Sequence, residues 1–156
     1  YENNNGTHFI FCTQNCIPLY NFDFYQSFMN KLDKSIVSYI DFNRKDRYKN
    51  LHEKMKEFIS YKDFIKQQPN MVLTREDIKL LIENDLTFYF KNLECPDEHY
   101  FINILLYILK RNIIKSQTHF CNFDITKTQA LEFKSINLNL VNLIKNKGYL
   151  FMRKVY

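Results

Sequence analysis

Strand-like apolar runs alternate along this chain with segments whose apolar residues recur at helical spacing. In the first helical segment, Phe24, Phe28 and Leu32 recur every four residues, which is typical of one buried helix face. The strand-like runs are 8–12, 35–42, 71–73, 120–123 and 149–152, and the helical segments are 21–32, 75–84, 100–111 and 137–147. This alternation predicts an α/β fold, with a mixed sheet flanked by helices.

Capping residues mark the ends of two of these helices. Thr74 precedes the segment 75–84, and Asp77 stands three residues later in place of the usual Glu or Gln of a capping box. Gly148 follows the last helical segment at the position where a left-handed residue ends a helix, and Lys145 and Lys147 complement the helix dipole there. We therefore expect helix boundaries at these two positions.

The composition is that of one folded domain. The 156 residues are 46% hydrophobic, enough for a core, and 2 Gly and 3 Pro argue against linkers. We predict a single domain over residues 1–156. The longest apolar stretch, 100–114, is interrupted by Asn103 and by the polar run 110–112, so we expect no transmembrane segment in this chain.

The net charge of +5 is modest, and basic residues are interspersed with acids. The densest basic run, 43–49, contains a tyrosine, as patches that follow a nucleic-acid backbone often do. Asp46 and Glu53 dilute this patch, and no nucleic-acid motif accompanies it. We expect no nucleic-acid partner.

The four cysteines leave the redox state open. They form no CxxC pair and have no histidine at zinc-finger spacing, so a structural zinc site is not expected. An even count permits two disulfides, and an apolar setting suits free thiols equally well. The four are Cys12, Cys16, Cys95 and Cys121.

The segment 95–101, Cys-Pro-Asp-Glu-His-Tyr-Phe, places two carboxylates and a histidine immediately before a helical pattern. Pro96 presets its own φ, and Asp97 and Glu98 follow where the unpaired N–H groups of a helix start favour negative charge. Helix capping is one interpretation of the pair, and a catalytic carboxylate is the other. His99 can relay a proton, although a histidine at this place is more often a packed helix residue.

Four segments in order, 8–19, 73–77, 95–101 and 150–154, resemble the core-2/I-branching β-1,6-N-acetylglucosaminyltransferase family and its xylosyltransferase relatives. That family has a hydrophobic strand running into a Ser-Gly-x-Cys-x-Pro-Leu-like turn, then a Leu-x-Arg segment, a Pro-Asp-Glu with aromatics behind it, and a closing Leu-Phe-Ala-Arg-Lys-Phe. The resemblance extends from about Thr7 to Tyr156.

The resemblance implies a partial GT-A-like domain, equivalent to the acceptor-side, C-terminal part of a glycosyltransferase, with the N-terminal nucleotide-binding half absent from this sequence. It further implies an inverting, metal-independent enzyme that needs no cofactor. Such an enzyme transfers a sugar of the N-acetylglucosamine or xylose class from a UDP-sugar donor to a hydroxyl of a glycan or protein acceptor. Full-length relatives are membrane-anchored, which suggests the Golgi or secretory lumen, or a viral or protist equivalent. A non-catalytic remnant or carbohydrate-binding module with the same fold is the alternative.

The resemblance also assigns residues to three roles: a base with its neighbour, cations that stabilise the leaving diphosphate, and sugar-contacting residues. The base is Glu98, with Asp97 as its neighbour, and the cations are Lys154 and Arg153. The sugar-contacting residues are Thr13, Asn15 and Cys16. No metal ligand is implied, and the chain has no Asp-x-Asp motif.

Two departures from the family pattern concern ligand binding. The residues 66–70 read Lys-Gln-Gln-Pro-Asn where the family commonly has Lys-Gly-Ser-Gln-Trp, and the chain contains no Trp, so a sugar-stacking platform would have to come from Tyr or Phe. The region 117–134 contains no Arg, although some relatives place a second diphosphate-binding arginine there.

Overall fold

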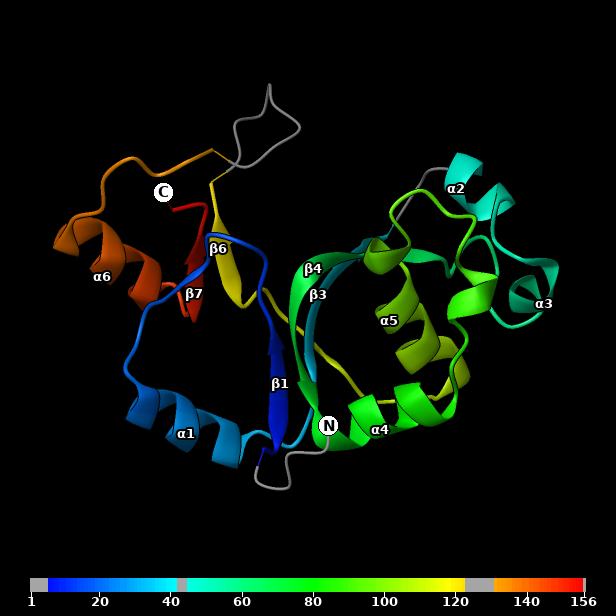
Figure 1. The fold of residues 1–156 in the computed structure, drawn as a ribbon, viewed down its shortest axis with the longest axis horizontal. Coiled ribbons are helices and arrows are strands. Elements are labelled where there is room, and N and C mark those ends of the chain that lie inside the picture. The colour runs from blue at the N-terminus through cyan, green and yellow to red at the C-terminus, as the bar shows by residue number, and fades with distance from the viewer. Residues whose placement is uncertain (1–5, 42–44, 123–130, 156) are drawn as a thin grey trace.

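The computed structural model describes residues 6–41, 45–122 and 131–155 (Figure 1). The strands are β1 (His8–Phe11), β2 (Ile17–Pro18), β3 (Ile36–Asp41), β4 (Ile65–Thr74), β5 (Ile114–Lys115), β6 (His119–Cys121) and β7 (Phe151–Arg153). The helices are α1 (Phe22–Lys31), α2 (Lys45–Lys49), α3 (Glu53–Lys56), α4 (Arg75–Glu83), α5 (Tyr100–Asn103) and α6 (Leu138–Asn146), with 3-10 turns η1 (Thr87–Tyr89) and η2 (Pro96–Glu98) and a π-helix η3 (Ile104–Ile108). The predicted α/β fold is confirmed.

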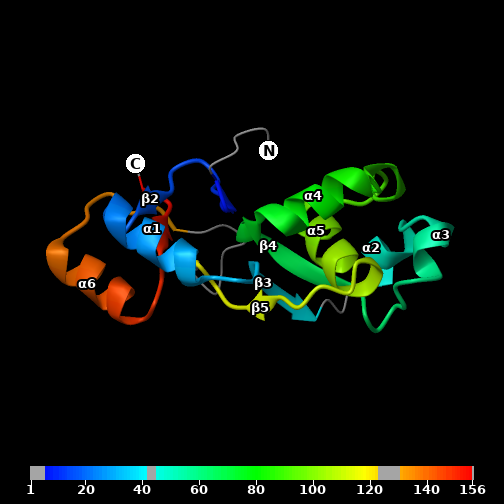
Figure 2. The same cartoon turned by 90° about the horizontal axis from the view of Figure 1, so that it is seen from below.

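The strands form two mixed sheets. The larger has the order β1-β4-β3-β5, in which β4 is antiparallel to both neighbours and β5 is parallel to β3. The smaller has the order β2-β7-β6, with β7 antiparallel to β2 and parallel to β6. Figure 2 shows an elongated molecule, with α1 and α6 toward one end and α2 and α3 at the other.

Helices cover both faces of the larger sheet. On one face, Met71 and Leu73 of β4 pack with residues of α4, α5 and η3 in the main core. On the other face, Val72 packs with Met29 of α1 and Ile36 of β3. Alternate residues of a strand point to opposite faces, so β4 contributes to both clusters. The smaller sheet has its own cluster, in which Met152 of β7 packs against Ile144 of α6.

Strand β4 is much longer than the predicted strand 71–73. The prediction is too short because the first half of the strand is polar in sequence and shows no apolar pattern. Val37 of β3 pairs with Met71, but Tyr39 pairs with Gln67, so the register shifts at a β-bulge opposite Ser38. Pro69 lies at this bulge, where a residue without an N–H group is tolerated. The bulge bends the sheet where the candidate site lies. Predicted strand residues 42 and 123, and residues 43–44 of the basic run, lie outside the described residues.

The predicted helix ends are confirmed, with one change in the capping box. The Asp77 N–H donates to Thr74 Oγ1 at 3.1 Å, and Gly148 has a φ of 84° after α6. The Asp77 carboxylate does not complete the capping box; it accepts from Ser35 Oγ and from Arg111 Nε. Among the described residues, no helix combines the length and the apolar character that crossing a membrane requires.

The helix predicted over 100–111 consists of α5 followed by the π-helix η3, and it ends earlier than predicted. Lys110 has a φ of 52°, which breaks the helix before the predicted end. At its start, the carboxylates of Asp97 and Glu98 lie in the 3-10 turn η2, which has no side-chain cap. Capping therefore does not account for Glu98, whose carboxylate has other partners.

Candidate active site

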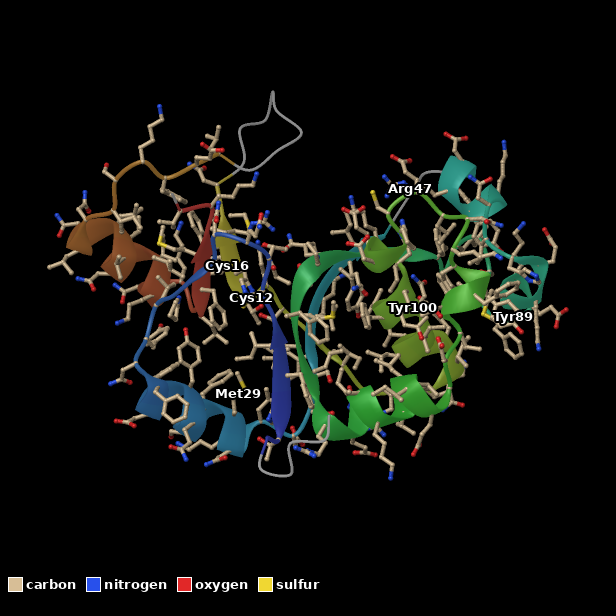
Figure 3. All side chains as sticks on the ribbon, in the orientation of Figure 1. Cys12, Cys16, Met29, Arg47, Tyr89 and Tyr100 are labelled. Carbon is tan, nitrogen blue, oxygen red and sulfur yellow. The ribbon has the colours of Figure 1, made fainter. Side chains whose placement is uncertain are left out.

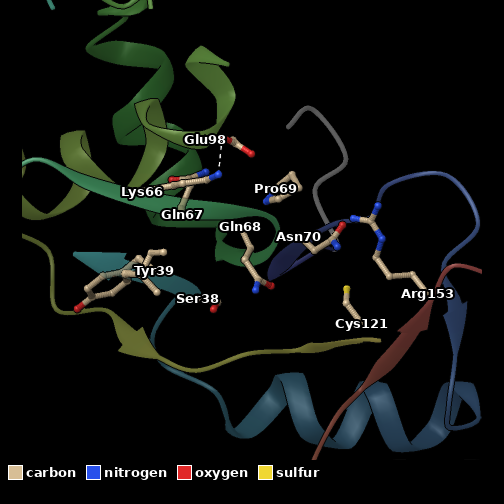
Figure 4. A pocket seen from close by; sticks show the side chains of 11 residues that line it. Ser38, Tyr39, Lys66, Gln67, Gln68, Pro69, Asn70, Glu98, Cys121 and Arg153 are labelled. Atoms are coloured by element: carbon tan, nitrogen blue, oxygen red, sulfur yellow. Dashed lines mark ion pairs between the residues drawn. The ribbon is translucent and has the colours of Figure 1, made fainter. Parts of the chain in front are cut away.

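A cavity of about 260 Å³ lies between the two sheets, and Figure 4 shows its lining. Strands β3 and β4 line it around the bulge, η2 contributes Glu98, and the smaller sheet contributes Cys121 and Arg153. The remaining lining residues are Ser38, Tyr39, Ile40, Lys66, Gln67, Gln68, Pro69 and Asn70. The volume is close to the lower end of the range of roughly 300–1,000 Å³ that is usual for ligand pockets.

Buried amide side chains fix the η2 turn against β4. Gln67 Nε2 donates to the Asp97 carbonyl at 2.9 Å, and Gln67 Oε1 accepts from the Ile102 N–H at 2.7 Å. Asn103 donates to the His99 carbonyl at 2.6 Å and to the Ile65 carbonyl at 2.8 Å. These bonds hold both ends of the turn on the sheet, so the Glu98 side chain projects from a rigid base.

The Glu98 carboxylate is bound on one oxygen by two cations. Arg47 Nη1 and Lys66 Nζ each lie 2.9 Å from Glu98 Oε2, and the side chain is 22% exposed. Within the described residues, no hydrogen bond or ion pair reaches Oε1. Burial by itself raises the pKa of this carboxyl, but the hydrogen bonds and charges of Lys66 and Arg47 outweigh burial and lower the pKa. Glu98 is therefore ionised at neutral pH.

Arg47 of α2 is a functional candidate that the sequence analysis did not identify. Its guanidinium, in a residue only 8% exposed, also lies 3.2 Å from Glu94 Oε2 and 3.3 Å from His99 Nε2. Figure 3 labels this residue, which belongs to α2. Its place within a basic run was the only signal in the sequence, and that signal does not separate it from its neighbours.

A second cavity, of about 360 Å³, adjoins the first at Arg153. Thr13, Gln14, Asn15 and Lys154 complete its lining. Two hydrogen bonds hold these segments together: the Thr13 N–H donates to the side-chain oxygen Oδ1 of Asn70 at 2.9 Å, and the Val155 N–H donates to the Asn15 carbonyl at 3.0 Å. Arg153 lines both cavities, and its Nε is buried without a hydrogen-bond partner among the described residues.

The residues suggested by the resemblance thus fall into separate groups. Glu98 and Arg153 line the first cavity, while Thr13, Asn15 and Lys154 line the second. Two other candidates line neither. Cys16 contacts Thr13 Oγ1 through Sγ at 3.5 Å. Asp97 is exposed and lines a different, apolar cavity with Phe90, Tyr100 and Phe101.

The four cysteines are free thiols. Cys12 Sγ lies 3.5 Å from His119 Nε2, and Figure 3 shows Cys12 and Cys16 between β1 and the smaller sheet. Burial raises the pKa of both the Cys12 and the Cys121 thiols to about 11, so these groups are protonated at neutral pH. In the parts of the chain that the structure describes, no three His, Cys, Asp or Glu side chains are grouped as a metal site.

The family model of the Core-2/I-Branching enzyme matches residues 2–144 of this chain. The chain therefore belongs to the core-2/I-branching enzyme family, whose members are glycosyltransferases that use a sugar donor and a glycan acceptor. The match includes the turn at 12–18, the Leu-x-Arg segment and the Pro-Asp-Glu, and it ends before Arg153 and Lys154. Comparisons with curated proteins and with solved structures gave no match.

Proposed function

We propose that this chain forms the acceptor-side part of an inverting, metal-independent glycosyltransferase. It transfers a sugar of the N-acetylglucosamine or xylose class from a UDP-sugar to a hydroxyl of a glycan or glycoprotein. The observation that carries the proposal is that one cavity is lined by an ionised carboxylate, Glu98 of the turn η2, and by an arginine, Arg153 of strand β7. In this proposal an N-terminal half outside this sequence binds the nucleoside.

Glu98 is the proposed base that takes the proton of the acceptor hydroxyl. Inversion needs a carboxylate within hydrogen-bond reach of the attacking oxygen, on the side of the anomeric carbon opposite the leaving group. Because Arg47 and Lys66 both bind Oε2, Oε1 is the oxygen left to accept this proton. The two cations also hold the carboxylate in one orientation. A base that is already aligned with the acceptor hydroxyl lowers the barrier to proton transfer.

Arg153 and Lys154 are the proposed partners of the diphosphate that leaves. Positive charge beside the departing phosphate stabilises the transition state, most strongly where water is excluded. The buried, unpartnered Nε of Arg153 supports this role, because a phosphate oxygen would satisfy a donor that no described group satisfies. Lys154 lines the adjoining cavity, so the two cations would bind different parts of one diphosphate.

The sugar of the donor is proposed to lie near the turn that carries Thr13 and Asn15. These side chains supply a hydroxyl and an amide beside Lys154, and Cys16 supports the turn through its contact with Thr13. Asp97 contributes through its main chain, because Gln67 binds its carbonyl and thereby fixes the turn that precedes Glu98.

A matched pair of variants tests the base. Glu98→Gln removes a negative charge from the lining of the cavity. Glu94→Gln removes the other carboxylate that Arg47 contacts, one whose side chain is 71% exposed and does not line the cavity. In the full-length protein, assayed with a panel of UDP-sugars and glycan acceptors, we expect Glu98→Gln to lower the transfer rate about 100-fold or more. Glu94→Gln is expected to keep at least about half of the rate, as for an exposed ion pair.

Full turnover by Glu98→Gln would refute the base assignment. Transfer is expected to persist in the presence of a chelator, and its loss on chelation would contradict the role of Arg153 and Lys154. Binding of glycans without transfer of any of the sugars by the full-length protein would favour the carbohydrate-binding alternative.

A further inference from the structure

We propose that His99 is a positioning residue that accepts a hydrogen bond from Arg47 and thereby fixes the Glu98 carboxylate for catalysis, an inference that rests on the proposed role of Glu98 as base. The imidazole of His99 is completely buried, and it shares one nitrogen of Arg47, Nη1, with the Glu98 carboxylate.

The position of the His99 ring is determined by its surroundings. The residue is 0% exposed, and its ring lies flat on Phe64, with centroids 4.6 Å apart and an interplanar angle of 15°. Nδ1 lies 2.9 Å from the Ile65 carbonyl oxygen. Because a carbonyl only accepts, Nδ1 carries the hydrogen of a neutral ring, and Nε2 is left as an acceptor.

That acceptor faces the same arginine nitrogen that binds the base. Arg47 Nη1 lies 3.3 Å from His99 Nε2 and 2.9 Å from Glu98 Oε2. A terminal guanidinium nitrogen has two N–H bonds in the guanidinium plane, so one is directed to each acceptor. The imidazole thus fixes the rotation of the guanidinium, and the guanidinium fixes Oε2. Lys66 is a less directional partner, because an ammonium on a flexible stem rotates freely.

The charged groups around His99 keep this arrangement intact near neutral pH. Burial lowers the pKa of His99 most, and the positive charges of Arg47 from α2 and Lys66 from β4 lower it further. The Ile65 carbonyl and the negative charge of Glu98 from η2 act in the opposite direction and do not reverse the shift. The imidazole therefore stays neutral and able to accept, whereas an imidazolium would repel Arg47.

The first test uses the unaltered protein. Nitrogen-15 NMR of the histidine side chains is expected to show His99 as the neutral tautomer with hydrogen on Nδ1 at pH values near neutrality. A hydrogen on Nε2, or a protonated ring, would overturn the proposal, because neither form accepts from Arg47. This measurement needs no substrate and does not depend on how a variant folds.

The second test compares two buried histidines with matched stacking. His119 lies on Phe151 with centroids 4.5 Å apart and an angle of 14°, nearly the same geometry as His99 on Phe64. His99→Phe keeps the ring stacking and removes the acceptor for Arg47. Carbon-13 NMR titration of the Glu98 carboxyl in the ligand-free protein is expected to move to higher pH in His99→Phe and to stay unchanged in His119→Phe.

The transfer kinetics of His99→Phe provide a third test. His99→Phe is expected to lower kcat about 10- to 100-fold, as for a misplaced catalytic group, and to move the acid limb of the pH profile upward together with the carboxyl titration. An unchanged Glu98 titration in folded His99→Phe overturns the positioning role, whatever Glu98→Gln shows. Full transfer by Glu98→Gln overturns the base assignment instead, so the two failures are distinguishable.

Discussion

Two histidines, His99 and His119, are fully buried. Each lies flat on a phenylalanine ring and hydrogen-bonds through both ring nitrogens. Burial lowers the pKa of both, and for His119 burial, with the nearby Arg153 charge, lowers it from 6.5 to about 4. At the scale of single residues, these groups make stability depend on pH.

We predict that the free energy of unfolding falls as the pH decreases from about 6.5 to about 4. In that interval the unfolded chain protonates His119 while the folded chain keeps it neutral, so the unfolded state binds more protons. The lowered pKa of His119 corresponds to a change of roughly 3 kcal/mol at most in the free energy of unfolding. Urea denaturation at several pH values checks this dependence. His119→Phe should flatten it, and an equally steep decline in that variant would show that His119 is not its source.

The sequence predicts some residues of the site and not others. Glu98 and Arg153 both line the candidate cavity. The sequence predicts Glu98 because its neighbours in sequence form a motif, and Arg153 because it stands beside the lysine of a second motif. Arg47 was not found, since it meets Glu98 across 51 positions only after α2 has folded onto the η2 turn. Neither its charge nor its spacing in the run 43–49 predicts that partner. Gln67 was missed for the same reason: its hydrogen bonds to η2 and α5 depend on the path of β4.

At the scale of elements, helices with capping residues were predicted well because their signals are local. Strand β4 was predicted only where it is apolar, since hydrophobic patterning detects burial in the core and not pairing around a polar bulge. The same polar residues line the cavity, so the part of the sheet that the pattern missed is the part that contributes to the site.

One buried carboxylate joins the elements at the other end of β4. Asp77 of α4 is 2% exposed and accepts from Ser35 at the start of β3 and from Arg111 after η3. Ser35 Oγ also accepts from the Thr74 N–H at 2.9 Å, at the junction of β4 and α4. This network connects the start of β3, the end of β4, the helix α4 and the segment that follows η3.

We predict that Asp77→Asn lowers the free energy of unfolding by about 2–4 kcal/mol, because it leaves buried hydrogen-bonding groups and the Arg111 charge poorly paired. Glu76→Gln is the matched control, since Glu76 also pairs with Arg111 but its side chain is 67% exposed. Its cost should stay below about 1 kcal/mol. Chemical denaturation measures both, and similar costs for the two variants would contradict the structural role of Asp77.

At the scale of the whole molecule, the proposed base lies in η2, which β4 of the larger sheet holds through Gln67, whereas the proposed cation Arg153 lies in β7 of the smaller sheet. The two sheets have very different cores. The larger sheet packs against α1 on one face and against α4, α5 and η3 on the other, whereas the buried residues of the smaller sheet's cluster are, among the residues that the structure describes, Leu19, Ile144 and Met152. Local opening costs less free energy where less apolar surface is buried. We therefore expect the side of the proposed site that carries Arg153 to be the less stable side.

Native-state amide hydrogen exchange tests this difference and its link to function. We predict that the amides of β7 exchange through openings of lower free energy than those of Met71, Val72 and Leu73 in β4. A ligand that binds only the closed form stabilises it by RT ln(1 + L/Kd), where L is the free ligand concentration, so the openings become rarer as the ligand concentration rises above Kd. Adding pyrophosphate or UDP to the full-length protein is thus expected to protect β7, which carries Arg153, and to leave β5 unchanged. Equal protection of β5 and β7, or protection of neither, would argue against a diphosphate site on the smaller sheet.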